Sequence, residues 1–329
     1  MSNELNDDDT GIIKEPEVVM EGKTANVVLD SQLFSSFMGC ARKGNYRFNR
    51  NLVSTKGKSN ALECGSYVHT IFEHYYRAII AGKSKGDAIS IGFDAGDEYV
   101  RGYHPDNKYV LDADEKGIHN TPLTAADASS PYQTSIEQAR QTMDEYFQHY
   151  LNDMWTPIAV EEVRGDLIFE ADDIRIIWKA KYDLIVDTSA GLMSVDHKTM
   201  KQRKDTMTLN NQFMGQCLVL KNRTVIVNKV GFQKTVKPHD KFTRPGINYT
   251  FDNLEEQRTE VIPYYARMWV AYKEANFYPP NYQQCENKFG MCEFYEDICR
   301  NDRGMREEAL KIFFKEDRPW DVLNVASDE

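Results

Sequence analysis

The residues best equipped for chemistry lie in the segment 179–198. Asp183 stands on one short apolar run, Asp196 and Lys198 stand on a second, and a polar turn separates the runs, which predicts a β-hairpin. Because side chains alternate along a strand, Asp196 and Lys198 should share one face and His197 should point to the opposite one. Two carboxylates can bind Mg²⁺ or Mn²⁺, and a nearby ammonium can polarise or deprotonate a water. These groups suit metal-assisted hydrolysis of phosphodiesters, whereas a hairpin with solvated charges is the alternative for this motif alone.

A second set of candidate ligands consists of cysteines. Cys285, Cys292 and Cys299 follow one another as Cys-x₆-Cys-x₆-Cys, just beyond a Pro-Pro pair. Zinc sites usually contain closer cysteine pairs, and the lack of an export signal argues against disulfides. Four thiolates are the usual ligands of a [4Fe–4S] cluster, and Cys40 is the natural fourth. The spacing leaves two possibilities open: a cluster that joins the first helix to the C-terminal loop, or four unligated thiols.

Composition and charge limit the class of protein. The chain has 329 residues, 41% of them hydrophobic and 28% charged, as in a soluble globular protein with one large domain or two small ones. It contains no apolar run long enough to cross a bilayer and no P-loop, so we expect a cytoplasmic protein without its own ATPase motor. The formal net charge is −11, but basic residues gather at 41–58, 198–204 and 229–244. Such patches can follow a phosphate backbone or form solvated faces.

The expected elements place the hairpin in the middle of an α-β-β-β-α-β order. Residues 1–26 are acidic and should form a tail, residues 82–131 a peripheral insertion with one weak helix, and residues 301–329 a charged tail with one short helix. Periodicity predicts helices at about 31–38, 61–81, 131–155, 209–221 and 253–276, and strands at about 158–164, 166–170, 173–178, 180–187, 192–197 and 224–233.

Taken together, these residues resemble the RecB-like branch of the PD-(D/E)XK nuclease superfamily, including phage exonucleases and CRISPR-associated nucleases that carry an iron–sulfur cluster. The resemblance spans about Val27 to Arg300, with one cysteine before the first motif and three near the end. Four family motifs match in order: Gly-x-x-x-His at 65–69, Gly-x-x-Asp at 180–183, (Asp/Glu)-x-Lys at 196–198 and Gln-x-x-x-Tyr at 212–216. Two matches are imperfect, because Ala180 replaces the glycine and Gln216 replaces the tyrosine.

The resemblance assigns a role to each site residue. The ligands that it implies for Mg²⁺ or Mn²⁺ are His69, Asp183, Asp196, the backbone carbonyl of His197 and, as an additional acid, Glu162. Lys198 would orient or deprotonate the attacking water, and Gln212 would hold Lys198 or the scissile phosphate. The implied ligands of the [4Fe–4S] cluster are Cys40, Cys285, Cys292 and Cys299. The basic residues expected to contact DNA are Arg42, Lys43, Lys201 and Lys204.

The resemblance also implies a fold and a function. We expect an α/β (α+β) protein with a restriction-endonuclease-like core, in which helices flank a central mixed sheet. Residues 27–300 would form the nuclease domain, with an iron–sulfur loop at 285–299. The implied function is that of a metal-dependent DNA exonuclease that acts in recombination, repair or replication. One expectation is that a phage encodes the protein, which would then lie in the host cytoplasm. Its partners would be DNA and a single-strand annealing or recombination protein. The alternative is a catalytically weak DNA-binding or adaptor protein that keeps the fold and cluster for structure.

Overall fold

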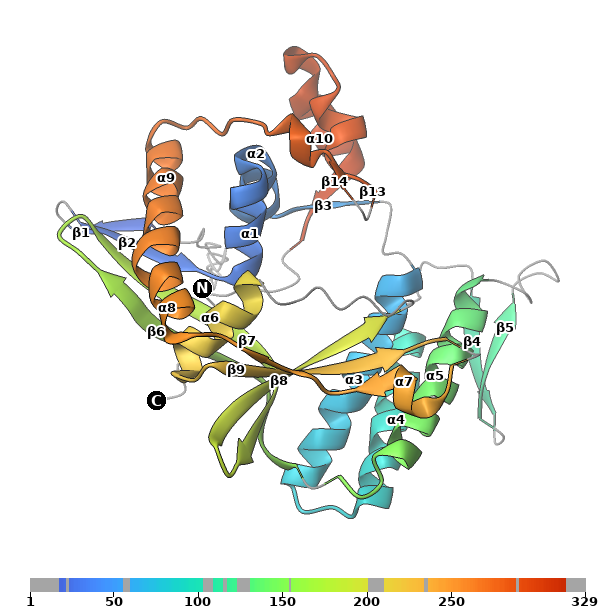
Figure 1. The fold of residues 1–329 in the computed structure, drawn as a ribbon. Coiled ribbons are helices and arrows are strands. Elements are labelled where there is room, and N and C mark those ends of the chain that lie inside the picture. Colours follow the sequence, from blue (N-terminus) through green and yellow to red (C-terminus); the bar gives the residue numbers. More distant parts are fainter. Residues whose placement is uncertain are drawn as a thin grey trace, which may run out of the picture. The chain divides into compact units, whose positions relative to one another are not determined.

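The computed structural model describes most of the chain as two compact units (Figure 1). The described residues are 18–21, 24–55, 60–102, 109–114, 117–122, 131–153, 155–200, 210–233, 236–287 and 290–317. The central unit comprises Thr55–Ile168 and Lys179–Val261. The terminal unit comprises Met1–Ser54, Phe169–Trp178 and Ile262–Glu329.

A mixed sheet forms the basis of the central unit. Its strands are β6 (Thr156–Glu170), β7 (Ile174–Thr188), β8 (Gly191–Met200), β9 (Thr224–Gly231), β10 (Phe242–Thr243) and β11 (Gly246–Asn248). The last residues of β6 and the first residues of β7 belong to the terminal unit. Strand β8 pairs antiparallel with β7 and parallel with β9, and both β10 and β11 pair antiparallel with β9. The predicted hairpin is confirmed: Thr188 pairs with Gly191, whose φ of 98° suits the tight turn.

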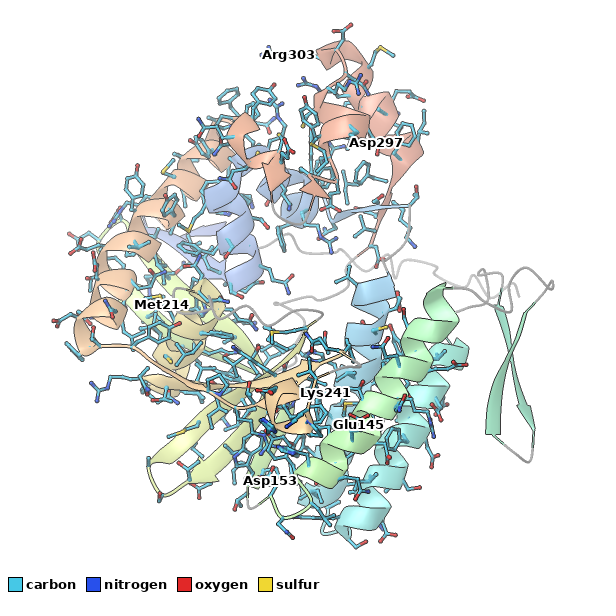
Figure 2. The ribbon with its side chains drawn as sticks, turned by 45° about the vertical axis from the view of Figure 1, so that its right-hand side comes forward. Glu145, Asp153, Met214, Lys241, Asp297 and Arg303 are labelled. Atoms are coloured by element: carbon cyan, nitrogen blue, oxygen red, sulfur yellow. The ribbon has the colours of Figure 1, made fainter. Side chains whose placement is uncertain are left out.

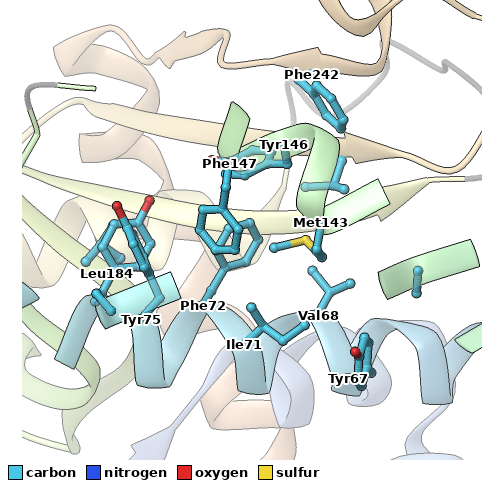
Figure 3. Close-up of a cluster of buried hydrophobic side chains, with 14 of the residues drawn as sticks. Tyr67, Val68, Ile71, Phe72, Tyr75, Met143, Tyr146, Phe147, Leu184 and Phe242 are labelled. Carbon is cyan, nitrogen blue, oxygen red and sulfur yellow. The ribbon is translucent and has the colours of Figure 1, made fainter. Parts of the chain in front are cut away.

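Helices cover both faces of this sheet. They are α3 (Asn60–Ile80), α4 (Lys85–Gly102), α5 (Pro131–His149), α6 (Asn211–Leu220), α7 (Pro238–Lys241) and α8 (Phe251–Glu256). On one face, aromatic residues of α3 and α5 such as Phe72 and Phe147 pack on Leu184 of β7 (Figure 3). On the other face, Val225 and Val227 of β9 pack against α6 and α8. This alternation confirms the expected mixed sheet between layers of helices.

The predicted insertion contains a long helix that packs tightly on α3. Figure 1 shows α3 and α4 side by side. The contact is close because Gly92 and Gly96 of α4 face α3: a Cβ at Gly96 would lie 2.7 Å from Cγ1 of Ile71 and 2.9 Å from Cε2 of Tyr67. Beyond α4, β4 (Tyr109–Asp114) and β5 (Gly117–Pro122) form a hairpin. The first part of the insertion therefore belongs to the core layer.

We expect Gly96→Val to destabilise the protein by about 2 kcal/mol or more, because the new side chain would overlap Ile71 and Tyr67. Gly86→Ala on the same helix is the matched control, since the nearest atom to its Cβ would be 3.9 Å away and alanine favours the helix by about 1 kcal/mol. Urea unfolding of both variants measures the difference. Equal midpoints for Gly96→Val and wild type would contradict the tight contact.

The terminal unit joins the two ends of the chain. Its elements are β1 (Val18–Glu21), β2 (Thr24–Leu29), α1 (Ser31–Gly39), α2 (Ala41–Gly44), β3 (Leu52–Ser54), α9 (Ile262–Glu274), β12 (Glu286–Asn287), β13 (Gly290–Met291), α10 (Arg306–Phe313) and β14 (Phe314–Glu316). Strand β2 pairs parallel with the first residues of β7, and β14 pairs antiparallel with β3. Asp30 caps α1 by accepting the backbone N–H groups of Gln32 and Leu33, and Phe34 packs edge-on against Trp178 at 5.4 Å.

The predicted tails need correction at both ends. Strands β1 and β2 begin inside the range 1–26, because the apolar residues of β2 pair with β7 and become buried. Helix α10 and strand β14 lie inside the range 301–329, where Leu310 and Phe314 join a buried cluster with Tyr46. No helix in the described part of the chain is long and apolar enough to span a membrane.

Candidate metal and nuclease site

Three potential metal ligands of the central unit converge at one point. The side chains of His69, Glu161 and Asp183 place ligand atoms within 4.8 Å of one another, and this is the only such group among the described residues. Nδ1 of His69 on α3 lies 3.6 Å from Oδ2 of Asp183 on β7. One imidazole nitrogen and two carboxylates form a donor set that suits Mn²⁺ as well as Mg²⁺. The residues present therefore fit a divalent cation.

Glu161, and not its neighbour Glu162, faces this point. The backbone of Glu161 has a φ of 53°, a left-handed conformation that residues other than glycine rarely adopt and that interrupts the regular alternation of the strand. Its carboxylate lies 2.5 Å from Nζ of Lys181, whereas Glu162 accepts a hydrogen bond of 2.7 Å from Arg164. The sequence offers two adjacent glutamates and no signal for the strained backbone, so sequence reasoning selected Glu162 and missed Glu161.

The predicted residues Asp196, Lys198 and Gln212 meet on one face of β8. Nζ of Lys198 lies 2.7 Å from Oδ2 of Asp196, and Nε2 of Gln212 donates to Oδ1 of the same carboxylate over 2.8 Å. Nζ of Lys198 also donates to Oε1 of Gln212 over 3.5 Å. Asn210 caps α6 by accepting the N–H of Gln212, which fixes the helical turn that carries the amide. Asp196 is fully buried, and Lys198 remains partly exposed.

Burial and neighbouring charges set the proton affinities of this site. Burial, and next the charge of Asp183, raise the pKa of Asp196 to about 6. Burial also acts to raise the pKa of Asp183, but the positive charges of His69 and Lys198 and the N–H of His197 lower it overall. Burial acts to lower the pKa of Lys198, but Asp196 and Asp183 raise it overall. The negative charges of Asp183 and Asp196 repel each other, and a divalent cation bound between them would offset this repulsion.

His197 points to the opposite face of the sheet, as the alternation predicts. Its ring stacks on Phe72 with 4.1 Å between centroids and lies nearly parallel to Tyr76 at 5.8 Å. Its backbone N–H donates to Oδ2 of Asp183 over 2.8 Å. Burial lowers the pKa of the imidazole to about 3, so the ring is neutral at pH 7. The side chain of His197 is therefore part of the core, while its backbone is part of the site.

We expect the metal-free protein to lose about 2 kcal/mol more stability between pH 7 and pH 5 than its His197→Gln variant. The unfolded imidazole takes up a proton as the pH falls below about 6.5, whereas the folded one stays neutral down to about 3. This contribution to stability is therefore present above pH 6.5 and is lost as the pH falls. Urea unfolding at the two pH values measures it, and an identical pH dependence in the variant would contradict a buried neutral histidine.

Four of the six cysteines line one cavity of the terminal unit. The cavity has a volume of about 160 Å³, and the thiols at its wall belong to Cys40, Cys285, Cys292 and Cys299. No three of these sulfur atoms lie within 4.8 Å of one another, so the thiols surround a space and do not form a single contact cluster. The other two, Cys64 and Cys217, are buried in the central unit, as their apolar surroundings in the sequence predict.

The surroundings of the cavity disfavour free thiolates in the absence of a cation. The backbone N–H of Asn281 donates to Sγ of Cys40 over 3.3 Å, and Lys43 lines the same cavity. Burial, and next the neighbouring thiols, raise the pKa of Cys285. Burial also raises the pKa of Cys299. Because four thiolates around one cavity repel each other, a metal centre is the group that could hold all of them deprotonated.

Two of the residues predicted to contact DNA lie at this cavity. Lys43 forms part of its wall, and Arg42 on α2 has one guanidinium nitrogen, Nη1, fully buried. The positive charge of Arg42 acts to lower the pKa of Cys299, which places the guanidinium close to that thiol. Lys201 and Lys204 lie outside the described residues. The basic side chains of α2 therefore lie beside the cysteine thiols.

Gln216, which stands where the family motif has tyrosine, ties α6 to β7. Its side chain is buried, and Nε2 donates to the backbone oxygen of Lys181 over 3.2 Å. In return, the hydroxyl of Tyr182 donates to the backbone oxygen of Gln216 over 3.0 Å. The residue thus holds the helix against the strand segment that precedes Asp183.

Comparisons with known proteins agree with this arrangement at the level of the family. The sequence matches the PD-(D/E)XK nuclease superfamily over residues 33–300, and no curated protein matches significantly. Among solved structures, a candidate exonuclease from Eubacterium rectale is 14% identical with a TM-score of 0.45, covering 92% of this chain and 94% of its own. The protein SSO0001 is 13% identical with a TM-score of 0.24, covering 39% of this chain and 60% of its own. Both similarities are too low to add to the family match.

The family match covers most of the chain, so the protein belongs to the PD-(D/E)XK nuclease superfamily. Membership in a nuclease superfamily implies that its substrate is a nucleic acid.

Proposed function

We propose that the protein is a metal-dependent exonuclease that hydrolyses phosphodiester bonds of DNA. The observation that carries this proposal is the convergence of His69, Glu161 and Asp183, next to the Asp196–Lys198 pair on the neighbouring strand. Acidic ligands and a lysine on neighbouring strands of one sheet are the groups that phosphodiester hydrolysis requires. The family match supports hydrolysis of a nucleic acid, and the resemblance to phage exonucleases supports DNA and attack from an end.

The proposed metal is Mg²⁺ or Mn²⁺. Asp183, Glu161 and His69 hold it, and Asp196 and the backbone carbonyl of His197 complete the protein ligands. A cation bound there polarises the phosphate and makes a bound water more acidic. The lowered pKa of Asp183 supports its role, because this carboxylate stays ionised and ready to bind a cation.

Lys198 and Gln212 act on the substrate side of the same strand. Lys198, whose raised pKa keeps it cationic, orients the attacking water and offsets negative charge that develops on the phosphate. Gln212 holds both Asp196 and Lys198 through its amide, so that the carboxylate and the ammonium keep a fixed separation. The expected pairing with an annealing or recombination protein stays a prediction, as does the role in recombination, repair or replication.

A comparison of linear and circular DNA tests the function. End-labelled linear duplex, single-stranded DNA and covalently closed circles are incubated with the protein and Mn²⁺, Mg²⁺ or EDTA. We expect the linear substrates to be degraded from an end, the circles to stay intact, and EDTA to stop the reaction. Cleavage of the circles would replace the exonuclease with an endonuclease. DNA binding without cleavage under any metal would favour the adaptor protein.

The cysteine cavity is the second component of the proposal: it holds a [4Fe–4S] cluster through Cys40, Cys285, Cys292 and Cys299. A tetrahedral zinc ion with Zn–S bonds of about 2.3 Å holds its sulfur atoms about 3.8 Å apart. No three of these four sulfur atoms lie within 4.8 Å of one another, and the cavity of about 160 Å³ that they line leaves room for the iron and sulfide of a larger centre. Such a centre would act in folding, because its ligands come from both ends of the terminal unit.

We expect protein purified without oxygen to contain about four iron atoms and four sulfides per chain, and Cys292→Ser to lose them together with about 2 kcal/mol or more of stability. The Asp183 site lies in the other unit, so the surviving variant should still bind Mn²⁺. Cys217→Ser, a buried thiol outside the cavity, is the matched control. One zinc and no iron would disprove the cluster, and neither metal with unchanged stability would disprove the metal site altogether.

A further inference from the structure

Arg244 lies in a cage of aromatic rings in the central unit. Its guanidinium carbon is 3.5 Å from the ring centre of Tyr150 and 3.7 Å from that of Trp155, so the cation stacks on both. Nη1 donates to Oδ2 of Asp153 over 2.7 Å, and Nη2 donates to the hydroxyl of Tyr146 over 2.6 Å (Figure 2 labels Asp153). Only 12% of the side chain is exposed. The position of this guanidinium is therefore fixed from several directions.

The same guanidinium fixes the amide of Asn228 on β9. Asn228 is fully buried, and its Oδ1 accepts hydrogen bonds from Nε of Arg244 over 3.2 Å and from the hydroxyl of Tyr146 over 3.0 Å. Because arginine can only donate, the oxygen of the amide must face it. The flipped amide would turn its NH₂ group toward Nε of Arg244, and that N–H would lose the acceptor it has here. The amide nitrogen of Asn228 therefore points the other way.

This nitrogen meets the ring of His197 on the adjacent strand. Asn228 and His197 are paired in the parallel ladder of β8 and β9, and Nδ2 of the amide lies 2.8 Å from Nδ1 of the imidazole. Since the amide nitrogen can only donate, Nδ1 must accept, and the proton of the neutral ring sits on Nε2. Arg244 thus sets both the tautomer and the orientation of His197 through one intervening side chain.

We propose that Arg244 is a positioning residue for the metal site, acting through Asn228 and His197. The proposal rests on the metal-dependent function proposed above. Its point of action is the backbone of His197, whose N–H donates to Oδ2 of Asp183 over 2.8 Å and whose carbonyl belongs to the proposed ligand set. A rotation of the imidazole between Phe72 and Tyr76 would displace this backbone, and with it the separation of the ligands.

A second buried ion pair of the same unit offers a matched comparison. Lys241 is 8% exposed and its Nζ lies 2.6 Å from Oε2 of Glu145 on α5, and Figure 2 labels both residues. This pair holds the segment before β10 to α5, and the Arg244–Asp153 pair holds the segment after β10 to the turn that follows α5. A purely structural Arg244 should therefore behave like Lys241.

The experiment compares Arg244→Lys with Lys241→Met by thermal unfolding, by Mn²⁺ titration and by steady-state kinetics. Lysine keeps the cation but has one nitrogen in place of the planar fork whose three nitrogens donate to Asp153, Tyr146 and Asn228. We expect Arg244→Lys to raise the Mn²⁺ concentration at half-maximal activity about 10- to 100-fold and to lower kcat, with KM for DNA little changed. Lys241→Met should lower the melting temperature and leave the Mn²⁺ requirement unchanged.

Tyr146→Phe is the second variant, in case Arg244→Lys does not fold. It removes the hydroxyl that bridges Arg244 and Asn228 and keeps the ring, so we expect a folded variant with a moderately lowered melting temperature and an increase of about two- to tenfold in the Mn²⁺ requirement. An Mn²⁺ requirement that stays at the wild-type value in every folded variant would reduce Arg244 to a structural role.

Two readouts need no cleavage and separate this proposal from the proposed function. Calorimetry with Mn²⁺ alone should show weaker binding in Arg244→Lys than in wild type. The ¹⁵N spectrum of wild-type His197 should show a proton on Nε2 and none on Nδ1, and Arg244→Lys should show a mixture of tautomers. If wild type binds Mn²⁺ without cutting DNA, the nuclease activity fails and the positioning role stands. If wild type carries the Nδ1 proton, the positioning role is wrong, whatever the activity.

Discussion

Lys198→Ala should lower the rate constant of DNA cleavage by about 100- to 10,000-fold while DNA binding and folding persist. Nζ of Lys198 lies 2.7 Å from Asp196 and reaches the exposed edge of the site, so it can serve both the attacking water and the charged phosphate. Alanine removes the cation and leaves no group that can replace it. Single-turnover cleavage of end-labelled DNA at saturating Mn²⁺ measures the loss directly, because product release does not contribute.

Lys221→Ala provides the matched control, since it removes one lysine from the end of α6, where 76% of its side chain is exposed. This variant should cleave DNA at the wild-type rate. A Lys198→Ala enzyme that retains activity within about tenfold of wild type would have lost at most about 1.4 kcal/mol of transition-state stabilisation. In that case another group must carry the chemistry.

Asp183→Asn should raise the Mn²⁺ concentration at half-saturation by more than about 100-fold, since loss of an outer-shell partner alone costs about 10- to 100-fold. Asp183 supplies a carboxylate whose lowered pKa keeps it ionised, and it also accepts the backbone N–H of His197. Asparagine preserves the acceptor and removes the charge. Calorimetric titration with Mn²⁺ therefore isolates the role of the charge, and Asp187→Asn, an exposed position on the same strand, is the control.

The two adjacent glutamates extend this test. Glu161→Gln should weaken Mn²⁺ binding, because its carboxylate lies with His69 and Asp183, whereas Glu162→Gln should only release Arg164. The opposite result would restore Glu162 as the ligand that the sequence suggested. Equal, small effects of both variants would limit the metal ligands to the motif residues.

The hairpin could be predicted from the sequence because its signals are local. Alternation along β8 fixes the opposite directions of Asp196 and His197, and the turn before Gly191 fixes which residues pair. The cap of α1 at Asp30 and the helical face of α3 also depend on neighbours within a few residues. The predicted meeting of Lys198 and Gln212 relied on the family resemblance, which supplied the long-range pairing that periodicity lacks.

The remaining features depend on backbone strain or on distant partners. Nothing in the sequence marks Glu161 as left-handed, because the strain is maintained by the surrounding sheet. Gly92 and Gly96 could equally have been loop residues, and only the close contact with α3 explains them. Strand β14 has three residues and no pattern of its own, so its pairing with β3 is visible only in the structure.

The terminal unit cannot be completed until the last strand has been made, because β3 pairs with β14. The central unit is complete once residue 261 has been made, but the terminal unit lacks half of its cysteine cavity until Cys299 leaves the ribosome. Helix α1 is made early, and its buried Phe37 must wait, with apolar surface uncovered, for Trp269, more than 200 residues later in the chain. Loading of the proposed metal centre would therefore be a late event. A newly made chain would pass through a stage in which the nuclease fold is formed and its cysteine site is still open.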